Sequence, residues 1–224
     1  MSASPTTRVQ IYHGSDQAHL LVGNAFISTR RNTLTTTFNY GSSYLENPQS
    51  WPVSPDLPLT GASSVLGLPG AMADGAPDRW GQRLIERSIN AQAREAGRAL
   101  PMITAVDYLL GVSDLMRHGA LRYRLSDTQD FLSVGTEIPK LINLPELLHA
   151  AEAVSSSRAD DEMAAIKLLL GAGSSALGGA RPKSSVQVDG RLFIAKFPHH
   201  ADEWDVMACA ITPGKSRRQK CFTS

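Results

Sequence analysis

A glycine-rich segment and a lysine that follows it are the residues of this chain with the clearest chemical content. Residues 173–183 have the sequence GSSALGGARPK, and Lys196 follows in the segment IAKFP. Glycines allow backbone N–H groups to approach anionic oxygens closely, and a lysine held on a strand adds a fixed positive charge. The order of the two features therefore indicates a site for the phosphates of a nucleotide. The alternatives are an ordinary loop between a helix and a hairpin, and a surface lysine on an edge strand.

A β-hairpin is expected to position this lysine. The turn VDGR at residues 188–191 joins two short strands, and the second strand contains Lys196. Upstream, the acidic residues 160–162 open a predicted helix that runs to Leu170, directly before the glycine-rich segment. The predicted order in this region is helix, glycine-rich segment, strand, turn and strand.

The first part of the chain has the pattern of a β-rich subdomain. Four short segments rich in β-branched or aromatic residues are separated by Gly14, by Gly23 and by residues 30–32; the segments are 9–12, 18–22, 24–27 and 33–40. They predict a small antiparallel sheet or partial barrel. Residues 49–70 are rich in proline and predict a connecting segment, with an SH3-type docking motif as the alternative. We therefore expect residues 1–70 to form a β-rich subdomain and a proline-rich linker.

Residues 71–170 are expected to be mainly helical, with one short strand at residues 119–124. Trp80, Leu84 and Ile85 share one face of a predicted helix, with Pro77 in its first turn and its end at Gly97. Two further helices are predicted at residues 104–110 and from residue 144 onward.

Composition narrows the class of protein. The chain has 224 residues, of which 42% are hydrophobic and 19% charged, which is typical of a globular protein of one or two domains. Residues 1–208 carry 18 basic and 21 acidic side chains, so the body gives no sign of direct nucleic-acid binding. Apolar runs fall far short of the roughly 18–20 residues that span a bilayer, and no signal peptide is recognised at the start. We expect a cytoplasmic protein without a membrane partner.

The last residues differ from the rest. Both cysteines and a net charge of +4 lie in residues 209–224. Neither the cysteines nor the adjacent pair His199 and His200 has the spacing of a metal site, so no metal ligand is assigned.

Four motifs in order resemble those of HipA-type toxins, the serine/threonine kinases of bacterial toxin–antitoxin pairs. They lie at residues 68–85, at residues 107–122, at residues 178–183 (GGARPK) and at residues 194–198 (IAKFP). The resemblance extends over about residues 8–207. It implies an α+β fold in which the N-terminal β-rich subdomain and helices are followed by an incomplete protein-kinase-like N-lobe at residues 171–208.

The resemblance also implies a site. Five residues would bind the phosphates of ATP, which the family uses with magnesium: Gly178, Gly179, Ala180, Lys183 and Lys196. Ser174 or Ser175 would be an autophosphorylation site. The implied partner is a HipB-like antitoxin, through which alone the protein would meet DNA, and the implied substrates are proteins such as aminoacyl-tRNA synthetases. Arg79, Arg83 and Arg87 would be candidate contacts for the antitoxin.

The sequence departs from the family after residue 208. There the family continues with a helix whose glutamate pairs with the lysine, whereas Pro213 and Gly214 break any helix here. The catalytic loop and the metal-binding aspartate are not found in family register, so no catalytic residue is assigned. The basic tail at 209–224 indicates a frameshift, a premature stop or a genuine short end.

Three functions remain open. The first is a catalytically inactive HipA-like toxin fragment. The second is a non-catalytic binding module that docks a HipB-like antitoxin or a separately encoded kinase lobe. The third is a minimal active kinase, which the missing base and metal ligands disfavour. If the helix that covers a kinase sheet is missing, Leu192, Ile194 and Phe197 should be partly exposed.

Overall fold

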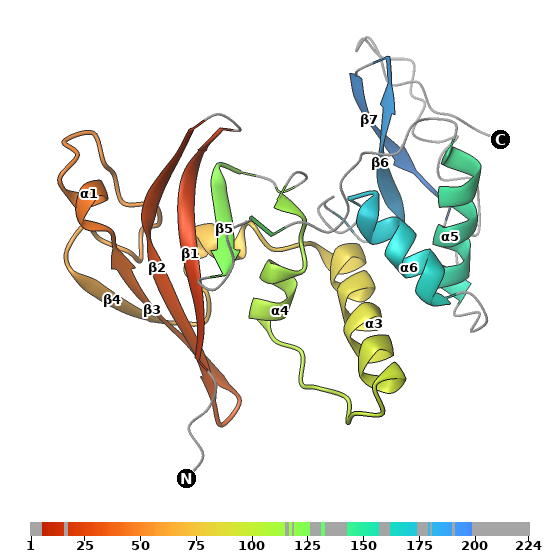
Figure 1. Cartoon of the computed structure of the whole chain (residues 1–224), viewed down its shortest axis with the longest axis horizontal. Helices are drawn as coiled ribbons and strands as arrows, with labels where there is room; N and C mark the ends of the chain where they lie inside the picture. Colours follow the sequence, from red (N-terminus) through yellow and green to blue (C-terminus); the bar gives the residue numbers. More distant parts are fainter. Residues whose placement is uncertain are drawn as a thin grey trace. The chain divides into compact units, whose positions relative to one another are not determined.

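Five strands from the first 125 residues pair into one antiparallel sheet in the computed structural model (Figure 1). Its order is β4-β3-β2-β1-β5, and the strands are β1 (Thr6–Ser15), β2 (Ala18–Arg30), β3 (Thr33–Tyr40), β4 (Ala62–Leu66) and β5 (Leu121–Leu125). The expectation of an α+β fold with an N-terminal antiparallel sheet is confirmed. The kinase-like N-lobe stays a prediction.

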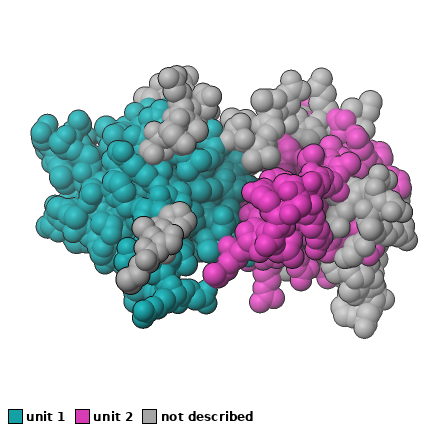
Figure 2. All heavy atoms as spheres, turned by 60° about the horizontal axis from the view of Figure 1, so that its bottom comes forward, with its two compact units in different colours: residues 1–77, 103–133 teal, residues 78–102, 134–224 magenta. Residues whose placement is uncertain are grey.

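The chain divides into two units (Figure 2). Unit 1 comprises residues 1–77 and 103–133, and unit 2 comprises residues 78–102 and 134–224. The structure describes the following residues: 6–15, 18–114, 117, 119–125, 131–132, 143–156, 162–173, 179, 181–189 and 191–198.

Strand β2 runs through Gly23, where the sequence predicted a break. A β-bulge lies at this point, because Ile11 pairs with Gly23 while Tyr12 pairs with Leu21, which leaves one extra residue in β2. A Cβ on Gly23 would lie 2.2 Å from the carbonyl oxygen of Asn39. Glycine is therefore required for the close approach of β3, and it does not end the strand.

Strand β4 lies inside the segment that the sequence predicted to be a connection only. It pairs with β3 at one edge of the sheet, and exposed and half-buried residues alternate along it. The hydroxyl of Thr36 donates to the carbonyl oxygen of Gly67 at 2.6 Å, just beyond the strand. The short helices α1 (Ser42–Leu45) and α2 (Gly70–Ala73) flank this segment in the chain.

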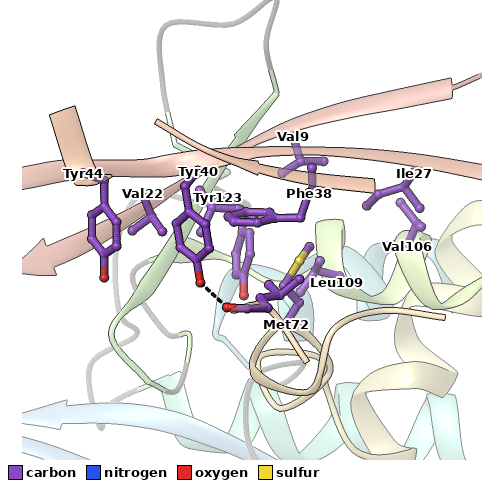
Figure 3. Packing of buried hydrophobic residues seen from close by; sticks show 13 residues of the cluster. Val9, Val22, Ile27, Phe38, Tyr40, Tyr44, Met72, Val106, Leu109 and Tyr123 are labelled. Atoms are coloured by element: carbon purple, nitrogen blue, oxygen red, sulfur yellow. Dashed lines mark hydrogen bonds between the residues drawn. The ribbon is translucent and has the colours of Figure 1, made fainter. Parts of the chain in front are cut away.

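Aromatic and aliphatic side chains fill the core of unit 1 (Figure 3). Tyr40 stacks on Tyr44 with ring centroids 5.5 Å apart. The Tyr40 hydroxyl donates to the carbonyl oxygen of Leu57 at 2.6 Å and accepts from the backbone N–H of Val53 at 3.2 Å. These bonds attach the proline-rich segment to the sheet, and burial raises the pKa of Tyr40.

The buried side chain of Arg117 links separate segments of unit 1 by hydrogen bonds to their backbone carbonyls. Its guanidinium donates to Gly75 at 2.7 Å and to Leu109 and Val112 at 2.8 Å each. It also lies 4.6 Å from the ring centroid of Tyr123 on β5. Burial lowers the pKa of Arg117 to about 10. Leu109 belongs to α4 (Ala105–Leu110), whose predicted position is confirmed and whose start has a capping box between Thr104 and Asp107.

The described part of unit 2 contains three helices and a hairpin: α3 (Arg79–Glu95), α5 (Leu144–Ser156), α6 (Glu162–Gly171), β6 (Lys183–Val188) and β7 (Arg191–Lys196). Trp80, Leu84 and Ile85 of α3 are buried, as their spacing predicted. Helices α5 and α6 pack on each other, and α6 also packs on α3.

Helix α3 ends where the sequence predicted, but it begins two residues later. Gly97 has a φ of +61°, and the N–H of Arg98 donates to the carbonyl of Ala93 at 2.8 Å, which is a Schellman motif. At the other end Asp78, and not a residue before Pro77, is the N-cap. Pro77 therefore lies outside the first turn.

Candidate phosphate-binding site

Two lysines lie directly opposite each other at the open end of the β6–β7 hairpin. Lys183 pairs with Lys196 in the antiparallel register that begins at Val188 and Arg191. Side chains of directly opposed residues project from the same face of a sheet, and like charges in this position repel. An anion between the two ammonium groups would remove this repulsion, so the pair is suited to binding phosphate oxygens.

The two lysines differ in their surroundings. Lys183 is only 8% exposed, whereas Lys196 is exposed. Burial lowers the pKa of Lys183, the charge of Lys196 lowers it further, and the carboxylate of Asp78 raises it. The pKa of Lys183 is therefore lower than usual, because its surroundings disfavour the charged form of the ammonium group. A multiply charged anion would favour that charge.

Gly179 lies beside Lys183. Its φ is +95°, a conformation in which glycine is strongly preferred, and a Cβ at this residue would lie 2.7 Å from Nζ of Lys183. Its N–H donates to the carboxylate of Asp78, and its carbonyl accepts from the N–H of Trp80 at 3.3 Å. The start of α3 and the glycine-rich segment, about a hundred residues apart in sequence, thus meet at this point.

Backbone and hydroxyl contacts hold the hairpin against the end of α6. The carbonyl of Ala172, just after α6, accepts from the N–H of Ser185 at 3.3 Å and from the hydroxyl of Ser184 at 3.2 Å. The N–H of Phe197 donates to the carbonyl of Pro182 at 2.9 Å, which continues the pairing beyond the two lysines. Lys183 and Lys196 are therefore held on a supported strand pair.

The structure brings together three of the residues that the sequence singled out, namely Gly179, Lys183 and Lys196. The other predicted site residues lie outside the described residues: Ser174, Ser175, Gly178 and Ala180. The pair His199 and His200 and the tail 209–224 lie outside them as well. Among the residues that the structure describes, no group of three or more histidine, cysteine or acidic side chains could hold a metal ion.

Asp78 is the residue of this site that sequence reasoning missed. The sequence placed it in the first turn of a helix, and nothing local indicates that its carboxylate contacts a backbone N–H about a hundred residues later. The pairing of the two lysines, in contrast, had a signal. Val188 pairs with Arg191, and counting five residues outward along each strand pairs Lys183 with Lys196.

The predictions for individual side chains had different outcomes. Ile194 is 56% exposed, as expected for an uncovered sheet face, but Phe197 is 3% exposed, so the prediction for it was wrong. Phe197 lies beyond the end of β7, where its N–H bonds to Pro182. Leu192 has no described side chain. Arg79 and Arg83 are exposed, whereas Arg87 is half-buried and donates to the carbonyl of Val154 on α5.

Comparison with models of known protein families and with curated proteins finds no match for this chain. The resemblance to HipA-type kinases therefore depends on the four motifs. No helix within the described ranges is long and apolar enough to cross a membrane.

Proposed function

We propose that this chain binds the phosphates of ATP through Lys183, Lys196 and the N–H of Gly179, as the phosphate-binding part of a HipA-like serine/threonine protein kinase of a toxin–antitoxin system. The observation that supports this most is the opposed lysine pair beside a glycine with positive φ. Ammonium groups and backbone N–H donors are the groups that contact phosphates in phosphoryl-transfer proteins. Both occur here within one unit.

The groups of the candidate site are suited to the phosphates of ATP but not to the magnesium ion that accompanies ATP. Two ammonium groups and a backbone N–H are suited to anionic oxygens, but the described residues include no cluster of metal ligands. We therefore assign no residue to magnesium. We also assign no base, so the 224-residue polypeptide is proposed to bind nucleotide without transferring its phosphate.

The test is ATP binding by isothermal titration calorimetry at low ionic strength. Replacing Lys196 with glutamine should weaken binding about tenfold or more, because each close charge-assisted contact contributes roughly 1.5–3 kcal/mol. Lys167→Gln is the matched control, since Lys167 is an exposed lysine of α6 in the same unit. Equal affinities of wild type and Lys196→Gln would contradict the proposal.

A second assay addresses catalysis. Incubation with radiolabelled ATP should give no phosphorylation of the protein or of an aminoacyl-tRNA synthetase. Incorporation that is abolished by Lys196→Gln would show that the polypeptide is an active kinase, and it would overturn the non-catalytic part of the proposal. Incorporation that persists in Lys196→Gln would indicate a contaminating kinase.

A HipB-like antitoxin is the proposed protein partner, and DNA would be reached only through it. Arg79 and Arg83 of α3 are exposed and lie one helical turn apart on the same face of the helix. The neighbouring residues Trp80 and Leu84 are buried and fix the helix in place. Such a pair is suited to an acidic surface on the partner. Co-purification with an antitoxin encoded beside the gene should be lost in Arg79→Glu/Arg83→Glu and kept in Arg98→Glu, which changes another exposed arginine of unit 2.

A further inference from the structure

The carboxylate of Asp78 makes an unusual contact for the N-cap residue of a helix. At an N-cap, the side-chain oxygen normally accepts a hydrogen bond from an N–H of the helix's own first turn. Asp78 makes no such bond within α3. Its carboxylate accepts instead from the N–H of Gly179.

The carboxylate therefore lies at the group that would bind an anion. Gly179 is adjacent to Nζ of Lys183, Lys183 pairs with Lys196, and the charge of Asp78 acts on Lys183. A carboxylate and a phosphate group both accept hydrogen bonds from N–H groups and both pair with ammonium groups. They would compete for the same donors, and their negative charges would repel each other.

We propose that the carboxylate of Asp78 is an internal competitor for phosphate. It accepts the hydrogen bond from the N–H of Gly179 and interacts with the positive charge of the lysine pair until a phosphate group displaces it. This inference rests on the proposed function and adds its regulation. The contact makes the site selective for polyphosphates over singly charged anions, because a ligand must contribute more charge than the carboxylate that it replaces. Loss of the negative charge would remove the repulsion, and it would weaken the competition because a neutral oxygen accepts the N–H of Gly179 less strongly than a carboxylate does.

The opposite role predicts the opposite result. If Asp78 serves only to orient Gly179 for a ligand, removing its charge would weaken phosphate binding. The sign of the change therefore distinguishes a competitor from a positioning residue. A purely structural role would leave the affinity of a correctly folded variant unchanged.

The experiment measures tripolyphosphate and ATP binding by calorimetry for wild type, Asp78→Asn and Asp78→Ser. Asparagine and serine are as favourable as aspartate at an N-cap, so α3 should still begin at the same residue, which circular dichroism checks. Asp189→Asn is the matched control. It removes the same charge from the hairpin turn, roughly 17–20 Å from the lysine pair along β6, and asparagine tolerates the φ of +47° found there.

Both Asp78 variants should bind tripolyphosphate about tenfold more tightly than wild type, and Asp189→Asn should bind it as wild type does. Addition of Lys183→Met to Asp78→Asn should abolish the gain. Unchanged or weaker binding in both Asp78 variants, with wild-type binding still dependent on Lys196, would overturn this inference and leave the proposed function intact. Absence of binding in wild type and in all variants would overturn both.

Discussion

Two buried tyrosines in the core of unit 1 give a sharp test of the structure, because the described residues provide a hydrogen-bond partner for only one of the two hydroxyl groups. The Tyr40 hydroxyl donates to Leu57 and accepts from Val53. The Tyr123 hydroxyl is also buried, but it has no hydrogen-bond partner among the described residues. Replacement of each tyrosine by phenylalanine removes one oxygen atom and keeps the ring.

The expected effects have different signs. In Tyr40→Phe the carbonyl of the fully buried Leu57 loses its partner, and an unsatisfied buried group costs about 1–3 kcal/mol. Tyr123→Phe removes a buried hydroxyl that has no partner within the described part of the chain, so stability should stay equal or rise by about 1 kcal/mol. The ring that contacts the guanidinium of Arg117 is kept in this variant. The two variants should therefore differ by roughly 1–4 kcal/mol.

Native-state hydrogen exchange with mass spectrometry is the appropriate assay, since it reports on unit 1 separately from unit 2. Protection of the amides in β2 and β3 should fall in Tyr40→Phe and should not fall in Tyr123→Phe. Urea unfolding followed by circular dichroism provides an independent measure. Equal losses of protection in the two variants would refute the assignment of hydrogen bonds in this core.

Three further predictions concern pH, the buried arginine and the candidate site. Burial raises the pKa of Tyr123 to about 12, so the folded state holds the phenol proton more tightly than the unfolded state does. The contribution of this group to stability should be complete below pH ~10, and the free energy of unfolding should fall by roughly 2–3 kcal/mol as the pH rises to ~12. On alkaline titration the loss should be smaller in Tyr123→Phe. Arg117→Met leaves three carbonyls without their donor and should cost about 3–5 kcal/mol in urea unfolding, against less than about 0.5 kcal/mol for the exposed Arg30→Met. Gly179→Ala should weaken ATP binding several-fold in calorimetry, because Gly179 has a positive φ and a Cβ there would contact Lys183. Gly97 also has a positive φ but has open space around it, so Gly97→Ala should lower stability and leave the affinity for ATP unchanged.

The sequence by itself determined the features that depend on neighbouring residues. The end of α3 at Gly97 was predicted because glycine favours a positive φ. The helix at residues 104–110 was also predicted, and the capping box that the structure shows at its start lies within four residues. The opposed position of Lys183 and Lys196 follows by counting from the turn between their strands. The nucleotide site and the HipA-like kinase function stay proposals.

Only the tertiary structure decided the features that depend on residues far apart in the chain. Strand β5 pairs with β1 although more than a hundred residues separate them, and β4 completes an edge within a segment rich in proline. Gly23 continues a strand because β3 approaches it closely, which no local pattern reveals. Asp78 meets Gly179 for the same reason: hydrogen bonds between distant residues depend on how the chain packs, whereas local propensity acts only within a few residues.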